Sequence, residues 1–123
     1  MPDGRLHGRR ILIVEDEFLQ AMELDTALRE AGAEILGPAA SVTQALCILA
    51  NGVLPDAASL DVNLDGQSVY PLADALAAHG IPFVFTTGYD KPTIPASYVR
   101  NRCLKKPVDP ETVIEPLGKL LAG

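Results

Sequence analysis

Acidic side chains follow directly on the apolar run Ile11–Val14. Glu15, Asp16 and Glu17 complete the segment "ILIVEDE", and Asp61 ends a second apolar run, in "AASLD". Carboxylates a few ångströms apart repel one another unless a cation joins them. Hard oxygen ligands suit Mg²⁺, which takes one or two carboxylates and keeps several waters. The residue types therefore indicate a magnesium site.

With such a cation beside it, Asp61 could also act as a nucleophile. A carboxylate can attack a phosphorus atom and become an aspartyl phosphate. Lys106 and the hydroxyl of Thr87 are candidates to hold the oxygens of the transferring phosphoryl group, whose charge the metal would neutralise. These residues lie far apart in the sequence. The chemistry therefore requires a fold that brings them together.

Alternating strand and helix patterns predict such a fold. Strands are expected at "RILIV", "AEILGPAA", "AASLDV", "FVFTT" and "RCLKKP", and the most apolar of them are typical of strands covered on both faces. Helices are expected over 17–32, 41–52, 68–80 and 109–123. Ser41 and Gln44 have the spacing of a capping box, and Asp109 before Pro110 is a typical helix start.

This order of elements predicts an α/β fold with a five-stranded parallel sheet, helices on both faces and right-handed crossovers. Ligands of such sheets bind beyond the carboxyl ends of the strands. The candidate acids, Thr87 and Lys106 all follow strand ends, so we expect them to converge there. Residues 1–9 are expected to be a flexible lead-in, and residues 10–123 a single domain.

Composition narrows the class of protein. The chain has 123 residues, 48% of them hydrophobic and 21% charged, which fits one globular domain. The net charge of -6 argues against nucleic acid as a partner. No apolar run approaches the roughly 18 residues of a membrane span, and "MPDGRLHGRR" is not a secretory signal. We expect a cytoplasmic protein, with Cys47 and Cys103 as free thiols packed as small core residues.

Four short motifs occur in order, each at the end of an expected strand: "VEDE", "SLDVNL", "FTTG" and "LKKP". Together they resemble the receiver domain of two-component response regulators. The resemblance covers the chain from Arg10 to about Leu121. It implies a flavodoxin-like receiver fold with strand order 2-1-3-4-5, and a phosphoprotein of signal transduction.

The resemblance also implies roles for the acidic residues. Asp61 corresponds to the phosphoacceptor, and Asp16 to the direct Mg²⁺ ligand. Glu15 would help to hold the metal, through a water. The backbone carbonyl of Asn63 would supply another ligand. The implied metal set is thus Glu15, Asp16, Asp61 and Asn63.

Two residues are implied to act on the phosphoryl group. Thr87, directly before Gly88, corresponds to the switch hydroxyl. Lys106, directly before Pro107, corresponds to the phosphate-binding lysine. We prefer it to Lys105 because strand alternation lets only one of the two side chains point at the site.

The chain departs from the usual receiver pattern at three places. Cys103 stands where the family usually has a tyrosine or phenylalanine. The ring of that residue swings inward when the switch threonine moves. The segment between Thr87 and Lys106 is short and contains two prolines, so the fourth helix of the family is expected to be stunted. Asp65 replaces a common proline. The first two departures and "FTTGY" resemble the FAT GUY subgroup, although Thr86 replaces its alanine.

The implied function is that of a single-domain response regulator. It would accept a phosphoryl group on Asp61, in a Mg²⁺-dependent reaction, from a histidine kinase of the HWE class or from a phosphotransfer protein. Small-molecule phosphodonors would also serve. The signal would pass by protein–protein interaction in a phosphorelay, without nucleic acid, membrane or turnover catalysis.

Three other classes of protein compete with this interpretation. A phosphatase of the haloacid-dehalogenase type needs a second acid two residues after the nucleophile, where this chain has Asn63. A flavodoxin-like cofactor site needs a phosphate loop, and the acids after Val14 would repel the phosphate. A degenerate receiver that binds a partner without phosphorylation remains an alternative, because Cys103 removes the usual aromatic relay.

Overall fold

The computed structural model describes residues 5–64, 66–88, 98, 103–106 and 109–122. In chain order the elements are β1 (Arg10–Val14), α1 (Phe18–Glu30), β2 (Glu34–Ala39), α2 (Val42–Ala50), β3 (Ala57–Asp61), β4 (Asn63–Leu64), β5 (Gln67–Ser68), α3 (Tyr70–Ala78), β6 (Phe83–Thr87), β7 (Cys103–Lys105) and α4 (Pro110–Ala122). Five parallel strands form one sheet in the order β2-β1-β3-β6-β7. Numbered within this sheet alone, the order is 2-1-3-4-5, which confirms the expected fold.

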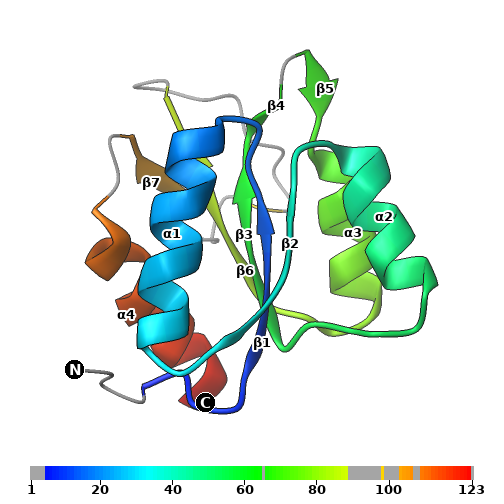
Figure 1. The fold of residues 1–123 in the computed structure, drawn as a ribbon. Helices are drawn as coiled ribbons and strands as arrows, with labels where there is room; N and C mark the ends of the chain where they lie inside the picture. Colours follow the sequence, from blue (N-terminus) through cyan, green and yellow to red (C-terminus); the bar gives the residue numbers. More distant parts are fainter. Residues whose placement is uncertain (1–4, 65, 89–97, 99–102, 107–108, 123) are drawn as a thin grey trace.

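Helices cover both faces of the sheet, with α1 and α4 on one face and α2 and α3 on the other (Figure 1). The interior strand β1, flanked by β2 and β3, shows why its sequence is continuously apolar. Ile11 and Ile13 belong to the core under α1 and α4, whereas Leu12 and Val14 belong to the core under α2 and α3. All four side chains are at most 1% exposed. Two hydrophobic cores therefore hold β1 from opposite sides.

The helix starts use the predicted caps. The Ser41 hydroxyl accepts a hydrogen bond from the Gln44 backbone N–H at 3.1 Å, and the Gln44 side-chain oxygen accepts from the Ala40 N–H at 2.8 Å. The first bond satisfies an N–H group that the helix start leaves unpaired, and the second ties the Gln44 side chain to the backbone just before the cap. At α4 the Asp109 carboxylate accepts from the Glu111 N–H at 3.0 Å. The caps set where α2 and α4 begin.

The chain before β1 packs against the end of α1. Leu6 is fully buried, and its N–H donates to the Ala31 carbonyl at 2.9 Å. Gly8 bonds similarly to Gly32 at 3.1 Å. Gly32 has φ +98°, and a Cβ there would lie 2.8 Å from the Cα of His7, so this approach requires glycine. The expected boundary after residue 9, between a flexible lead-in and the domain, stays a prediction. Leu6, which precedes that boundary, is nevertheless part of the core.

A short hairpin that the sequence analysis did not predict follows β3. Strands β4 and β5 pair antiparallel, with Asn63 opposite Ser68 and Leu64 opposite Gln67. Leu64 is 1% exposed, and the Gln67 side-chain oxygen accepts from the Val42 N–H at 3.2 Å. The hairpin is therefore tied to the start of α2, and it holds the chain directly after Asp61.

The expectation for the cysteines was wrong for Cys47, which is exposed on α2, whereas Cys103 is half-buried; both are free thiols. The stunted fourth helix expected between Thr87 and Lys106 lies outside the described residues, as does Asp65. No helix in the described part of the chain has the length and apolar character needed to cross a bilayer.

Candidate functional site

Backbone hydrogen bonds continue the sheet one step past three strand ends and so place the candidate residues. The bonds run from Glu15 N–H to Ala39 C=O (2.9 Å), from Val62 N–H to Thr86 C=O (2.8 Å) and from Lys106 N–H to Thr87 C=O (2.6 Å). Each bond fixes the backbone directly after the end of a strand, at a candidate site residue or next to one. The site is therefore attached to the rigid carboxyl edge of the sheet.

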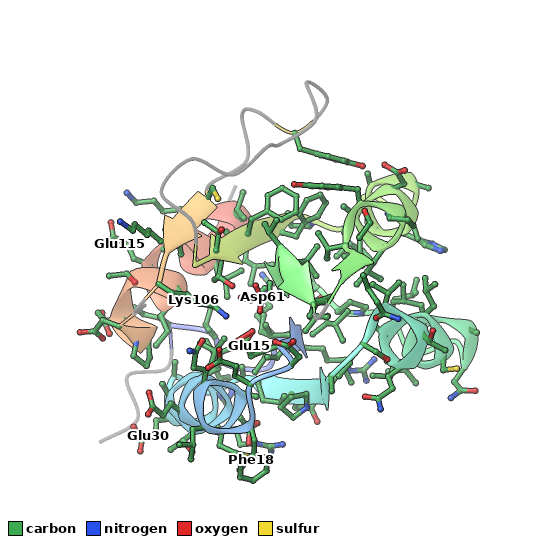
Figure 2. The ribbon with its side chains drawn as sticks, turned by 90° about the horizontal axis from the view of Figure 1, so that it is seen from above. Glu15, Phe18, Glu30, Asp61, Lys106 and Glu115 are labelled. Carbon is green, nitrogen blue, oxygen red and sulfur yellow. The ribbon has the colours of Figure 1, made fainter. Side chains whose placement is uncertain are left out.

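The Lys106 ammonium joins two carboxylates at this edge. Its Nζ lies 2.6 Å and 3.0 Å from the two oxygens of Glu15 and 2.9 Å from Oδ2 of Asp61. The side chains of Lys106, Glu15 and Asp61 are 15%, 6% and 1% exposed. Seen from above, the three side chains converge from three strands, whereas Phe18 and Glu30 of α1 point away (Figure 2). Charged groups this buried require partners, and here they partner one another.

Asp16 completes a cluster of three carboxylates. One oxygen each from Glu15, Asp16 and Asp61 lies within 4.8 Å of the others. Ligand oxygens around Mg²⁺ lie about 2.1 Å from the ion, so neighbouring ligands are about 3 Å apart and opposite ones about 4 Å. The cluster therefore fits a divalent ion held by some carboxylates directly and by others through water. These residues could hold the metal that the sequence indicates.

Burial perturbs the charges of the site. Desolvation, together with the hydrogen bond to Asp61, raises the pKa of Glu15 from 4.5 to about 8, although Lys106 acts in the opposite direction. Burial alone would lower the pKa of Lys106, but its hydrogen bonds to Glu15 and Asp61 outweigh that effect and raise it. Without a metal, the site therefore favours a proton on Glu15 more strongly than water does, and Lys106 stays charged.

The two threonines that end β6 lie on opposite faces. Thr86 is the register partner of Asp61, and it lines a cavity together with Glu15 and Lys106. Thr87, the expected switch hydroxyl, is 2% exposed and by strand alternation shares the face of Phe85. The sequence pattern indicates Thr86 only as a strand residue. Its place on the face of Asp61 depends on the register between β3 and β6, which cannot be read from either strand alone.

The remaining candidates also lie at this edge. Asn63 begins β4 two residues after Asp61, and its backbone pairs with Ser68. Lys105 ends β7 and is exposed, whereas Lys106 reaches the carboxylates. The sheet thus directs Lys106, and not its neighbour, into the cluster.

Aromatic rings occupy the region around Cys103. Cys103 pairs in register with Phe85 and packs against the core under α2 and α3. The rings of Tyr70, Phe83, Phe85 and Tyr98 contact one another with centroids 5.3–6.3 Å apart. The Tyr98 hydroxyl donates to Asp74 of α3, and with burial this bond raises the pKa of Tyr98 to about 12. Tyr98 is therefore a core residue.

Comparison with known proteins gives the family. SdrG from Sphingomonas melonis Fr1, solved in solution, is 39% identical; the match covers 95% of this chain and 98% of SdrG with a TM-score of 0.78. The receiver domain of the hybrid histidine kinase CckA is 29% identical, with 91% and 98% of the two chains covered and a TM-score of 0.75. This chain belongs to the receiver domains of response regulators. The likeness to SdrG fits the FAT GUY subgroup that "FTTGY" resembles.

Longer relatives contain this receiver domain as one part. The response regulator PhyR from Brucella abortus is 25% identical, with 97% of this chain but 50% of PhyR covered and a TM-score of 0.79. The phyllosphere-induced regulator PhyR from Methylorubrum extorquens is 35% identical over 81 residues, which are 64% of this chain and 30% of that protein. The chain spans about a third of that curated relative. No family model matches the sequence.

Proposed function

We propose that this receiver domain accepts a phosphoryl group on Asp61 in a Mg²⁺-dependent reaction and acts as a response regulator in a phosphorelay. One observation carries the proposal. Asp61 is 1% exposed, lies 2.9 Å from the Lys106 ammonium and shares a carboxylate cluster with Glu15 and Asp16. The solved BeF₃-activated conformation of SdrG, 41% identical over 91% of this chain, supports it, because beryllofluoride stands in for a phosphoryl group.

In the proposed reaction, an oxygen of Asp61 forms a bond to the phosphorus of the donor. The bond from phosphorus to the donor breaks, and a phosphohistidine donor leaves as a neutral imidazole after taking up a proton. Lys106 holds an oxygen of the phosphoryl group and offsets its charge. A bound Mg²⁺ would supply electrostatic stabilisation of the transferring group, held by Glu15, Asp16, Asp61 and the carbonyl of Asn63.

We propose a histidine kinase, of the HWE class, or a phosphotransfer protein as the physiological donor. The similarity to SdrG and PhyR supports a donor of this kind. The proposed output is a protein–protein contact, and it is controlled through Thr87. The backbone carbonyl of Thr87 accepts a hydrogen bond from the Lys106 N–H. In this role the protein gains and loses its own phosphoryl group and does not turn over a separate substrate.

The test uses acetyl phosphate as the donor and intact-mass spectrometry as the readout. We expect one phosphoryl adduct on the wild-type protein with Mg²⁺ or Mn²⁺, and none after chelation with EDTA. Asp61→Asn should remove the adduct. Asp25→Asn is the matched control, because that carboxylate pairs with Arg29 on α1 and lies outside the cluster; it should leave the yield unchanged.

Three results would contradict the assignment of Asp61 as the phosphoacceptor of a response regulator. An adduct of equal yield in Asp61→Asn would place the phosphoryl group elsewhere. Catalytic release of phosphate from esters, in excess over protein, would favour the phosphatase alternative. A wild-type protein that takes no phosphoryl group from acetyl phosphate or from a partner kinase would favour the degenerate receiver.

A further inference from the structure

A cavity of about 100 Å³ lies beneath the phosphoacceptor site, between α1, α4 and the sheet. Gln20 and Leu24 of α1 line one side, and Pro110 and Val113 of α4 line the other. Among these, Val113 is 1% exposed. The exposed Glu23 also lines the space, so it is a pocket between the two helices that opens to solvent.

Two hydroxyls form the floor of the cavity on the sheet. Ser59 of β3 and Thr86 of β6 line it and are 2% and 7% exposed. The positions two residues earlier on the same face, Ala57 and Val84, are apolar and belong to the core under α1 and α4. The apolar layer is thus interrupted by hydroxyls where the empty space occurs. No buried side-chain oxygen of the described residues lacks a hydrogen-bond partner, but a hydroxyl has two acceptor lone pairs besides its donor. A donor group of a molecule in the cavity would bind to a remaining lone pair.

The roof of the cavity is part of the phosphoacceptor site. Glu15 and Lys106 line the space, and Lys106 Nζ also contacts Glu15 at 2.6 Å and Asp61 at 2.9 Å. A molecule that packs against these side chains from below would shift the ammonium relative to Asp61. Occupancy of the cavity would therefore be coupled to phosphorylation through Lys106.

We propose that this cavity binds a small uncharged molecule with a compact apolar body and one hydroxyl or amide group. A cavity of about 150 Å³ holds benzene, with its six non-hydrogen atoms, so about 100 Å³ suits roughly four or five. The walls of Leu24 and Val113 match the apolar body, and the hydroxyls of Ser59 and Thr86 match the polar group. An anion is disfavoured, because the Lys106 ammonium in the lining is already paired with Glu15 and Asp61, and burying a charge without a partner is costly.

Propionamide tests the binding, with propionate as an anion of the same size. In methyl and amide NMR spectra we expect propionamide to give saturable shifts at Leu24 and Val113, and propionate to give none. Thr86→Val keeps the size of the side chain but removes the hydroxyl, and should weaken propionamide about tenfold. Val113→Phe should fill the space and abolish binding. Leu120→Phe, on the exposed side of α4, should bind as the wild type does.

Spectra and melting curves of each variant establish that it is folded before it is titrated. Shifts that stay linear with propionamide concentration in the wild type, or equal affinity in folded Val113→Phe, would overturn the site. Equal affinity in Thr86→Val would overturn the assignment of the polar group.

The coupling rests on the proposed function and is measured separately. Saturating propionamide should slow phosphorylation of the wild type by acetyl phosphate several-fold, and an unchanged rate would overturn the coupling. Binding is also measured in Asp61→Asn, which has no proposed phosphoacceptor. If Asp61 is not phosphorylated but propionamide binds, the proposed function fails and the cavity site stands; the reverse result removes the cavity site alone.

Discussion

Ion pairs at the carboxyl edge of the sheet and ion pairs on the outer helix surfaces use the same residue types in opposite surroundings. The side chains of Lys106 and Glu15 are 15% and 6% exposed and meet at 2.6 Å. Those of Lys119 and Glu115 on α4 are 71% and 64% exposed and meet at 3.2 Å. In Figure 2, Glu115 lies near the edge of the view, whereas Glu15, Asp61 and Lys106 lie nearer its centre.

Burial decides how strongly the two charges of such a pair depend on each other. Water screens the exposed pair, so its two charges are nearly independent. The buried pair has lost its hydration, so removing one member leaves the other without a partner. Both carboxylates that Lys106 contacts are therefore held in a state that a cation or a proton must stabilise.

The largest expected effect comes from Lys106→Met in metal-free buffer. Loss of the ammonium leaves Glu15 and Asp61 buried together, and we expect the free energy of unfolding to fall by about 3–5 kcal/mol. Urea denaturation measures it. A loss under about 1 kcal/mol would contradict the view that Lys106 is the cation that stabilises these carboxylates.

Asp16→Asn is expected to act in the opposite direction and more weakly. Removing one of three neighbouring carboxylates relieves repulsion, so the metal-free protein should gain about 1 kcal/mol. Mg²⁺ should raise the melting temperature of the wild type by mass action and that of the variant much less. Asp25→Asn serves as the control and should keep the full response to Mg²⁺. An equal response in Asp16→Asn would exclude Asp16 as a ligand.

Glu15 predicts a pH dependence in metal-free buffer. Folding raises its pKa from 4.5 to about 8, so between these values the folded state binds more protons than the unfolded state. The free energy of unfolding should therefore fall as the pH rises through this window. Glu15→Gln should flatten that part of the profile, as measured by urea denaturation at several pH values. Parallel profiles for the variant and the wild type would show that Glu15 titrates normally.

The smallest effect is expected for the exposed pair. Lys119→Met should change the free energy of unfolding by no more than about 0.5 kcal/mol. The same urea experiment as for Lys106→Met gives a direct comparison. A cost comparable with that of Lys106→Met would mean that burial is not what separates the two regions.

Sequence patterns predicted the fold because each element was specified locally. The strands around Ile11–Val14 and Phe83–Thr87 are apolar enough to be covered on both faces, and Ser41 and Asp109 carry their own cap signals. Right-handed crossovers then leave few arrangements of the sheet. The β4–β5 hairpin was missed, because its two-residue strands have no detectable period. Leu6 was missed because its neighbours are polar.

The sequence was enough to predict which strand ends carry the residues of the candidate site. The contacts themselves were not. That Lys106 meets both Glu15 and Asp61, and that Thr86 rather than Thr87 shares the face of Asp61, depends on strand register and rotamers, which no single segment encodes. Cys47 looked like a core residue from composition, but it is exposed on α2.

The most direct test of the central claim is to locate the phosphoryl group chemically. An aspartyl phosphate is an acyl phosphate, which borohydride reduces to homoserine, whereas an unmodified aspartate is not reduced. After reaction with acetyl phosphate and Mg²⁺, reduction and peptide mass spectrometry should find homoserine at position 61 and at no other aspartate. Homoserine at another position, or none despite a phosphoryl adduct, would contradict Asp61 as the phosphoacceptor.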